Sequence, residues 1–335
     1  MVVTCGGIDL GGTKIQCVIV DASQKVLGSA RTATPTVGGP AAVADAMATA
    51  LREATTGAGM KTSELAGVGV GSPGAIDAKA GTVSGAGNLP DWGGSFPLGP
   101  TLSDALGTTV ALGNDVGVAT DAELVLGAGR EVSSLIGVFW GTGVGSGIML
   151  DRRPWLGRGA AGELGHTVVK LGGRRCPCGR RGCVEAYAGR GAMEARARRL
   201  HAQGKQTDLF KLMEKNNRTR LMSSIWAKAL ERKDGLAREL VGDAIAALGA
   251  GVASAVNLLD VEMVVIGGGL GIRLGEPYVK RIEAAMHPHL FVDERPPVVR
   301  LAELGDLGGA IGASLLVKPA GGAPKRPAAR TKRAA

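Results

Sequence analysis

A strand, a glycine-rich turn and a second strand follow one another twice in this chain, and this repeat limits the fold most strongly. The first copy places IDLGGTK (8–14) between strands predicted at 4–9 and 14–20. The second places GTGVGSG (141–147) after a strand predicted at 135–140, with IML beginning another strand. The copies lie about 130 residues apart and suggest two halves built alike. Glycine supplies 55 of 335 residues, an excess that indicates many close backbone approaches.

Alternating strand and helix patterns surround both copies and predict an α/β fold of about two domains. Further strands are predicted at 25–32, 66–71, 109–112, 263–269 and 297–302, and helices at 40–56, 116–127, 185–203, 236–258, 276–289 and 308–317. The segment 205–234 has no clear pattern. No uncharged apolar run reaches the roughly 18 residues of a membrane span, and the N-terminal sequence lacks the features of a secretory signal. We therefore expect a cytoplasmic protein with no membrane partner.

The positive charge of the chain is concentrated near its C-terminal end. Six of the 39 basic residues fall within 318–335, and the remaining 33 nearly balance the 30 acidic residues. Nucleic acid is therefore not an expected partner. The Pro-, Ala- and Arg-rich tail at 319–335 has no apolar periodicity and is predicted to be disordered.

Glycine-rich loops can surround a phosphate with backbone N–H groups because no Cβ blocks the approach. The candidate residues for this role are Asp9, Gly11, Gly12, Thr13 and Lys14 in the first loop, Gly141, Thr142, Gly143 and Gly145 in the second, and Gly267, Gly268 and Gly269 at the end of the strand predicted at 263–269. The alternatives are a hairpin turn with positive φ at the first loop and simple packing at the third. The sequence has neither the Walker A nor the Rossmann spacing, which disfavours a dinucleotide fold.

Four soft or borderline metal donors lie within 18 residues: His166, Cys176, Cys178 and Cys183. Three thiolates and one imidazole match a closed tetrahedral zinc site. The alternative is a cluster of reduced thiols. A zinc module that binds nucleic acid is also suggested by the neighbouring Arg174, Arg175, Arg180 and Arg181. However, the sequence has no aromatic residue between Trp155 and Tyr187 that could stack on bases.

Two carboxylates flank the predicted metal segment. Glu163 precedes His166 by three residues, and Glu185 follows Cys183 by two. A zinc-bound imidazole keeps one N–H for a second partner, so His166 and both glutamates are candidates to hold the hydroxyl groups of a polyol. Asp115 lies where a strand becomes a helix and is a candidate proton acceptor, with helix capping by Asn114 or Asp115 as the alternative.

Together, IDLGGTK, Asn114-Asp115, GTGVGSG, GELGH (162–166), CPCGRRGCVE (176–185) and VVIGGGLG (264–271) resemble the ROK family of sugar kinases, from residue 6 to about 318. The resemblance implies the actin-like, hexokinase-like (ribonuclease H-like) fold, in which two α/β domains close over a cleft. It places residues 1–115 and about 301–318 in a small lobe and 116–300 in a large lobe with the zinc site.

The same resemblance implies roles for individual residues. Asp115 would be the catalytic base, and the sugar would be held by Asn88, Asn114, Asp115, Glu163, His166 and Glu185. His166 and the three cysteines would ligate structural Zn²⁺. The loops at 9–14 and 141–145 would bind the phosphates of ATP, with Mg²⁺, and 267–271 would lie near the adenosine.

The expected function is ATP-dependent phosphorylation of a hexose, with glucose preferred. Fructose, mannose, N-acetylmannosamine and N-acetylglucosamine stay open as substrates, and polyphosphate stays open as a phosphate donor. The family also contains sugar-responsive repressors with an added DNA-binding region ahead of the kinase-like part, but the resemblance here already begins at residue 6, so a repressor is not expected. A catalytically idle sugar sensor is a further alternative. A homo-oligomer, a dimer or tetramer, is expected from the resemblance alone.

Overall fold

The computed structural model describes residues 3–87 and 89–317, which form two compact units. Unit 1 comprises the described residues of 1–131, 147–161 and 303–335, and unit 2 comprises 132–146 and 162–302. The lobe boundaries implied by the family resemblance stay a prediction.

Unit 1 contains a five-stranded sheet of order β3-β2-β1-β4-β8. Its strands are β1 (Cys5–Leu10), β2 (Lys14–Val20), β3 (Val26–Ala33), β4 (Val68–Ser72) and β8 (Val110–Asn114). β1 pairs antiparallel with β2 and parallel with β4, which pairs parallel with β8. A smaller sheet joins β5 (Ala75–Asp77), β6 (Thr82–Ser84) and β7 (Ser95–Phe96). The glycine-rich turn after β1 therefore lies at the carboxyl end of a central strand.

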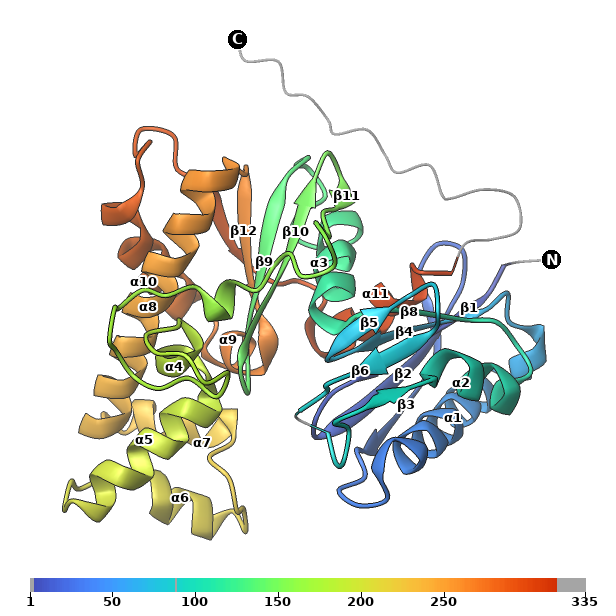
Figure 1. Cartoon of the computed structure of the whole chain (residues 1–335), viewed down its shortest axis with the longest axis horizontal. Helices are drawn as coiled ribbons and strands as arrows, with labels where there is room; N and C mark the ends of the chain where they lie inside the picture. The colour runs from blue at the N-terminus through green and yellow to red at the C-terminus, as the bar shows by residue number, and fades with distance from the viewer. Residues whose placement is uncertain (1–2, 88, 318–335) are drawn as a thin grey trace. The chain divides into compact units, whose positions relative to one another are not determined.

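Helices cover both faces of this sheet. Alternate residues of β1 face opposite ways, and a Cβ on Gly6 would lie 3.2 Å from Leu51 of α1 (Gly39–Gly57). A Cβ on Gly7 would lie 1.9 Å from the backbone oxygen of Ala310 in α11 (Gly308–Ser314). Figure 1 shows α11, in red, beside the blue and cyan strands. Glycine in β1 thus lets a helix from the C-terminal part of the chain lie directly on the sheet.

The remaining helices of unit 1 are α2 (Leu98–Leu106) and α3 (Asp115–Val125), together with the short 3-10 turns at Thr62–Glu64 and Gly305–Leu307. The buried Glu123 of α3 joins residues distant in the chain. Its carboxylate accepts hydrogen bonds from the backbone N–H groups of Ala128 (3.0 Å), Glu303 (3.1 Å) and Leu304 (3.0 Å). The Glu123 side chain therefore connects α3 by hydrogen bonds to the segment before α11.

The second sheet has the order β11-β10-β9-β12-β13. Its strands are β9 (Leu135–Trp140), β10 (Val144–Leu150), β11 (Arg153–Pro154), β12 (Met263–Gly267) and β13 (Val298–Leu301). In unit 2, β12 pairs parallel with both β9 and β13. The helices of unit 2 are α4 (Glu185–Ala188), α5 (Arg190–Ala202), α6 (Leu209–Lys215), α7 (Ser223–Glu231), α8 (Gly235–Leu259), α9 (Gly268–Leu274) and α10 (Glu276–Met286), with 3-10 turns at Leu164–His166 and His287–His289.

Among the described residues, α8 is the one helix long and apolar enough to cross a membrane. In its most apolar window, 61% of the residues are buried inside the structure. A Cβ on Gly249 would lie 2.6 Å from the backbone of Ala285 in α10, so α8 packs closely on a neighbouring helix. This burial is typical of the core helix of a globular protein.

Three sequence predictions of local structure were wrong at their boundaries. The helix predicted at 185–203 breaks at Gly189, whose backbone is extended at φ −57° and ψ 126°. The strand predicted at 263–269 ends at Gly267, because α9 begins at Gly268. The second glycine loop covers 141–143 alone, since β10 already begins at Val144. The unassigned segment 205–234 contains α6 and α7.

Candidate active site

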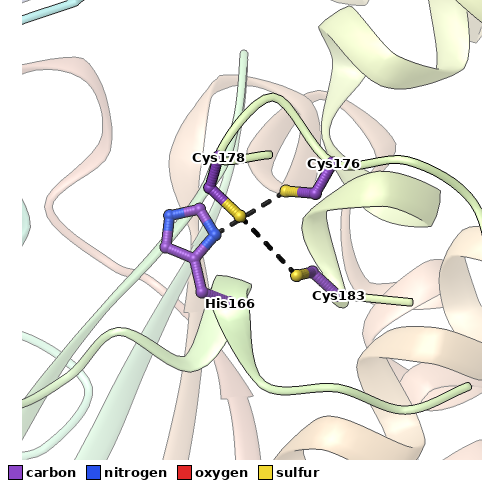
Figure 2. Close-up of side chains that lie close together, drawn as sticks. All are labelled: His166, Cys176, Cys178 and Cys183. Atoms are coloured by element: carbon purple, nitrogen blue, oxygen red, sulfur yellow. Dashed lines mark hydrogen bonds between the residues drawn. The ribbon is translucent and has the colours of Figure 1, made fainter. Parts of the chain in front are cut away.

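The donor atoms of His166, Cys176, Cys178 and Cys183 all lie within 4.8 Å of one another (Figure 2). Cys178 Sγ lies 3.8 Å from Cys183 Sγ, and Cys176 Sγ lies 3.7 Å from His166 Nδ1. Tetrahedral zinc with bonds of about 2.3 Å to sulfur and 2.0–2.1 Å to nitrogen separates its ligands by about 3.8 Å and 3.6 Å, respectively. The donor set therefore fits zinc in chemistry and in spacing.

A tight hairpin brings the three thiols together. Cys176 N–H donates to the Arg180 backbone oxygen at 2.8 Å, and Arg175 and Arg181 form an isolated antiparallel β-bridge. Gly182 has φ +84°, and a Cβ there would lie 1.8 Å from the Lys170 oxygen, so the hairpin requires glycine at this position. The backbone N–H of Arg180 lowers the pKa of the Cys178 thiol to about 7, whereas burial raises the pKa of Cys176 to about 12.

Two of the arginines near the cysteines are occupied by interactions within unit 2. Arg174 forms an ion pair with Asp243, and its guanidinium lies 4.7 Å from the centre of the Tyr187 ring. Arg181 donates to the Gly173 oxygen at 3.3 Å. These contacts favour a structural role for the two side chains over a nucleic-acid surface.

Both predicted carboxylates of unit 2 lie beside the metal donors. His166 turns Nδ1 toward Cys176, and its other ring nitrogen, Nε2, lies 3.8 Å from Glu163 Oε2. Glu185 Oε1 lies 4.0 Å from Cys176 Sγ, while Glu185 Oε2 accepts the backbone N–H of Val144 at 2.9 Å. Glu185 therefore connects the metal segment to the second glycine loop.

The second glycine loop also contacts the start of α5. Arg190 N–H donates to the Gly141 oxygen at 3.1 Å, and Gly191 N–H donates to the Thr142 oxygen at 3.0 Å. The Arg190 guanidinium donates to Thr142 Oγ1 at 2.9 Å. No sequence motif marks Arg190, and its position one residue after a glycine inside a helical pattern was the available signal.

The third glycine cluster is explained in part by packing. Gly268 has φ +80°, and a Cβ there would lie 2.6 Å from the backbone of Trp140. A Cβ on Gly267 would lie 2.9 Å from the Phe139 ring. Gly269 has more space, with Ser223 Oγ at 3.8 Å. The packing alternative therefore accounts for Gly267 and Gly268, and the predicted nearness of adenosine stays a prediction.

In unit 1, the first glycine loop is held at both sides. Gly11 N–H donates to the Lys14 oxygen at 2.9 Å, and Thr34 Oγ1 donates to the Gly11 oxygen at 2.6 Å. Neither Gly11 nor Gly12 is among the described residues with positive φ. The alternative of a hairpin turn that needs positive φ therefore does not explain these glycines. Burial raises the pKa of Asp9 to about 6, against the opposing charge of Lys14.

Asn114 and Asp115 have distinct positions at the start of α3. Asn114 is the N-cap, since its Oδ1 accepts the backbone N–H groups of Val116 (3.1 Å) and Gly117 (3.0 Å). Asp115 is the first helical residue and accepts the Val116 N–H at 2.9 Å. The capping role therefore belongs to Asn114. Asn88, a predicted sugar ligand, lies outside the described residues.

Comparison with known proteins gives one consistent family. The ROK family model matches residues 5–320. The chain is 31% identical over 317 residues to a glucokinase of Halalkalibacterium halodurans, covering 93% of this chain and 94% of the relative. It is 31% identical to the N-acetylgalactosamine kinase AgaK of Shewanella sp., covering 92% and 95%. The crystal structure of a ROK family glucokinase from Streptomyces griseus in complex with glucose and AMPPNP is similar with a TM-score of 0.79 and 30% identity, covering 93% and 98%. The predicted actin-like, hexokinase-like fold class is confirmed.

Proposed function

The chain belongs to the ROK family, and on this premise we propose that it is a sugar kinase that transfers the γ-phosphoryl group of ATP to the 6-hydroxyl of a hexose, preferably glucose. The arrangement of Glu185 carries the proposal. Its carboxylate lies between a Cys₃His metal-binding cluster and a glycine loop, so one side chain links a site for hydroxyl groups to a site for phosphate. The similarity to the Streptomyces griseus glucokinase, solved with glucose and AMPPNP, supports this assignment.

Phosphoryl transfer requires a positioned alcohol, neutralised phosphates and an acceptor for the alcohol proton. In our proposal Asp115 accepts that proton. Asn88, Asn114, Glu163, His166 and Glu185 hold the sugar. The loops at 9–14 and 141–145 bind the phosphates, with 267–269 near the adenosine. Magnesium would neutralise phosphate charge, and the Asp9 carboxylate is an oxygen ligand of the type that Mg²⁺ prefers.

Zinc has a structural role in this proposal. When bound, it would hold the hairpin 176–183 and fix the tautomer of His166. The imidazole Nε2, on the side away from the thiols, would then donate to a sugar hydroxyl beside the Glu163 carboxylate. The protein would act in the cytoplasm, where ATP is available.

Other hexoses are the second candidate substrates. The specific observation is that AgaK of Shewanella sp., an N-acetylgalactosamine kinase, is as similar in sequence as the Halalkalibacterium glucokinase, at 31% identity each. Overall identity thus does not separate glucose from an N-acetylhexosamine, and fructose and mannose also belong in the test.

The experiment is a coupled assay of ADP formation with purified protein, MgATP and a panel of hexoses and N-acetylhexosamines. We expect glucose to give the highest kcat/KM. A higher value with another sugar would transfer the proposal to that substrate. Sugar binding without ADP formation on any member of the panel would refute kinase function and support a sugar sensor. Replacement of ATP by polyphosphate in the same assay determines the donor.

A further inference from the structure

The break between α4 and α5 shapes the second glycine loop. Gly189 is extended, so the chain turns and presents the N–H groups of Arg190 and Gly191 to the oxygens of Gly141 and Thr142. A continuous helix over 185–203 would bond these N–H groups within the helix. Because of this break, backbone hydrogen bonds from the first residues of α5 hold the second glycine loop.

The guanidinium of Arg190 completes this contact. Arg190 is 8% exposed, and its Nη2 donates to the hydroxyl of Thr142 at 2.9 Å. Its Nη1 donates to the Leu221 oxygen at 3.0 Å, while its Nε has no hydrogen-bond partner. Burial lowers the pKa of Arg190 and the positive charge of Arg220 lowers it further, while the negative charge of Glu194 acts in the opposite direction. The buried cation of Arg190 therefore lies next to the second glycine loop.

No carboxylate in residues 3–87 and 89–317 forms an ion pair with Arg190. Glu194, one turn along α5, is already bound by Arg198 at 2.7 Å, by Arg220 at 3.2 Å and by the Leu221 N–H at 3.0 Å. Buried charges are costly unless they are paired. The charge of Arg190 is thus not neutralised by a contacting protein group, and an anion near the loop would stabilise it.

We propose that Arg190 is a positioning residue for the nucleotide: its guanidinium fixes the hydroxyl of Thr142 in loop 141–143, and its positive charge favours a phosphate at that loop. The inference rests on the proposed function, because it takes the loop as part of the ATP site. Preorganised N–H groups and a fixed charge bind an anion without a reorganisation cost. Arg190 acts through Thr142 and is not itself a catalytic residue.

The test uses Arg190→Met, Arg190→Lys, Thr142→Val and the double variant Arg190→Met/Thr142→Val. The KM for MgATP, the KM for glucose, the thermal midpoint and the Kd of a non-hydrolysable ATP analogue are measured for each. The matched control is Arg199→Met, which removes an exposed arginine from the same helix and should keep the wild-type values.

We expect Arg190→Met to raise the KM for MgATP and the Kd of the analogue roughly tenfold to a hundredfold, the range for loss of one hydrogen bond from a charged group. The KM for glucose should stay within about twofold, and Arg190→Lys should restore part of the nucleotide affinity. The double variant should bind the nucleotide no more weakly than the single variant with the larger effect, because both changes remove the same interaction.

Three results would overturn the inference. They are unchanged nucleotide parameters in folded Arg190→Met, equal increases in both KM values, and additive effects in the double variant. If Arg190→Met does not fold, Thr142→Val serves as the test, since the Thr142 side chain is exposed and its replacement should not prevent folding. An unchanged Kd of the analogue in Thr142→Val also refutes the inference. A wild-type chain that binds the analogue but phosphorylates no sugar refutes the proposed function instead, and the effect of Arg190 on that Kd still tests the inference.

Discussion

Replacement of Asp115 by asparagine should abolish most of the catalysis and leave the fold intact. Asn114 caps α3, and the Asp115 oxygen that accepts the Val116 N–H at 2.9 Å has a counterpart in the asparagine side chain. The lost charge at the helix start costs about 0.3–1 kcal/mol of unfolding free energy. Loss of a general base lowers kcat by about 10²–10⁴, or roughly 3–5 kcal/mol of activation free energy. The effect on catalysis should therefore exceed the effect on stability several-fold.

The assay compares kcat for glucose phosphorylation with the free energy of unfolding from urea titration. Asp104→Asn is the matched control, because it removes one exposed carboxylate from α2 in the same unit. It should keep both wild-type values. A folded Asp115→Asn protein with kcat within a few-fold of wild type would refute the assignment of the base.

Three further changes test the metal site, a buried carboxylate and a titrating group. Cys183→Ser should lower bound zinc below one ion per chain and reduce the thermal midpoint, and full zinc by elemental analysis would contradict the metal assignment. Glu123→Gln should lower the free energy of unfolding by about 2–4 kcal/mol, because three backbone N–H groups bind this carboxylate, and a loss under about 1 kcal/mol would contradict that role. The pKa of Asp9 is raised to about 6, so the stabilisation of its neutral form is present below about pH 4 and is lost as the pH rises through 6. Asp9→Asn should therefore unfold at higher urea than wild type at pH 7 and at similar urea at pH 4; an equal difference at both pH values would contradict the shift.

The elements around the glycine loops were predictable because their patterns are local. Two short apolar runs on either side of the glycine turn identify β1 and β2 within a residue of their ends, and both strands are buried almost throughout. The metal cluster was likewise predictable, since its four donors lie within 18 residues and their chemistry is specific.

The contacts that join the site were not predictable, because they connect residues far apart in the chain. Glu185 binds the Val144 N–H across 41 positions, and Arg190 binds Thr142 across 48. No periodicity encodes such side-chain contacts. The break at Gly189 was also missed, since a single glycine is tolerated within a helix and its effect here depends on the loop that accepts the freed N–H groups.

Zinc titration of the metal-free protein is the most direct test of the account. The rate of glucose phosphorylation with MgATP is measured as zinc is added back after chelation. We predict that activity rises with added zinc and saturates at one ion per chain, because zinc bound by this cluster would hold His166 and the segment leading to Glu185 in place. Full activity without zinc, or no activity at any zinc ratio in protein that has refolded, would contradict the central claim.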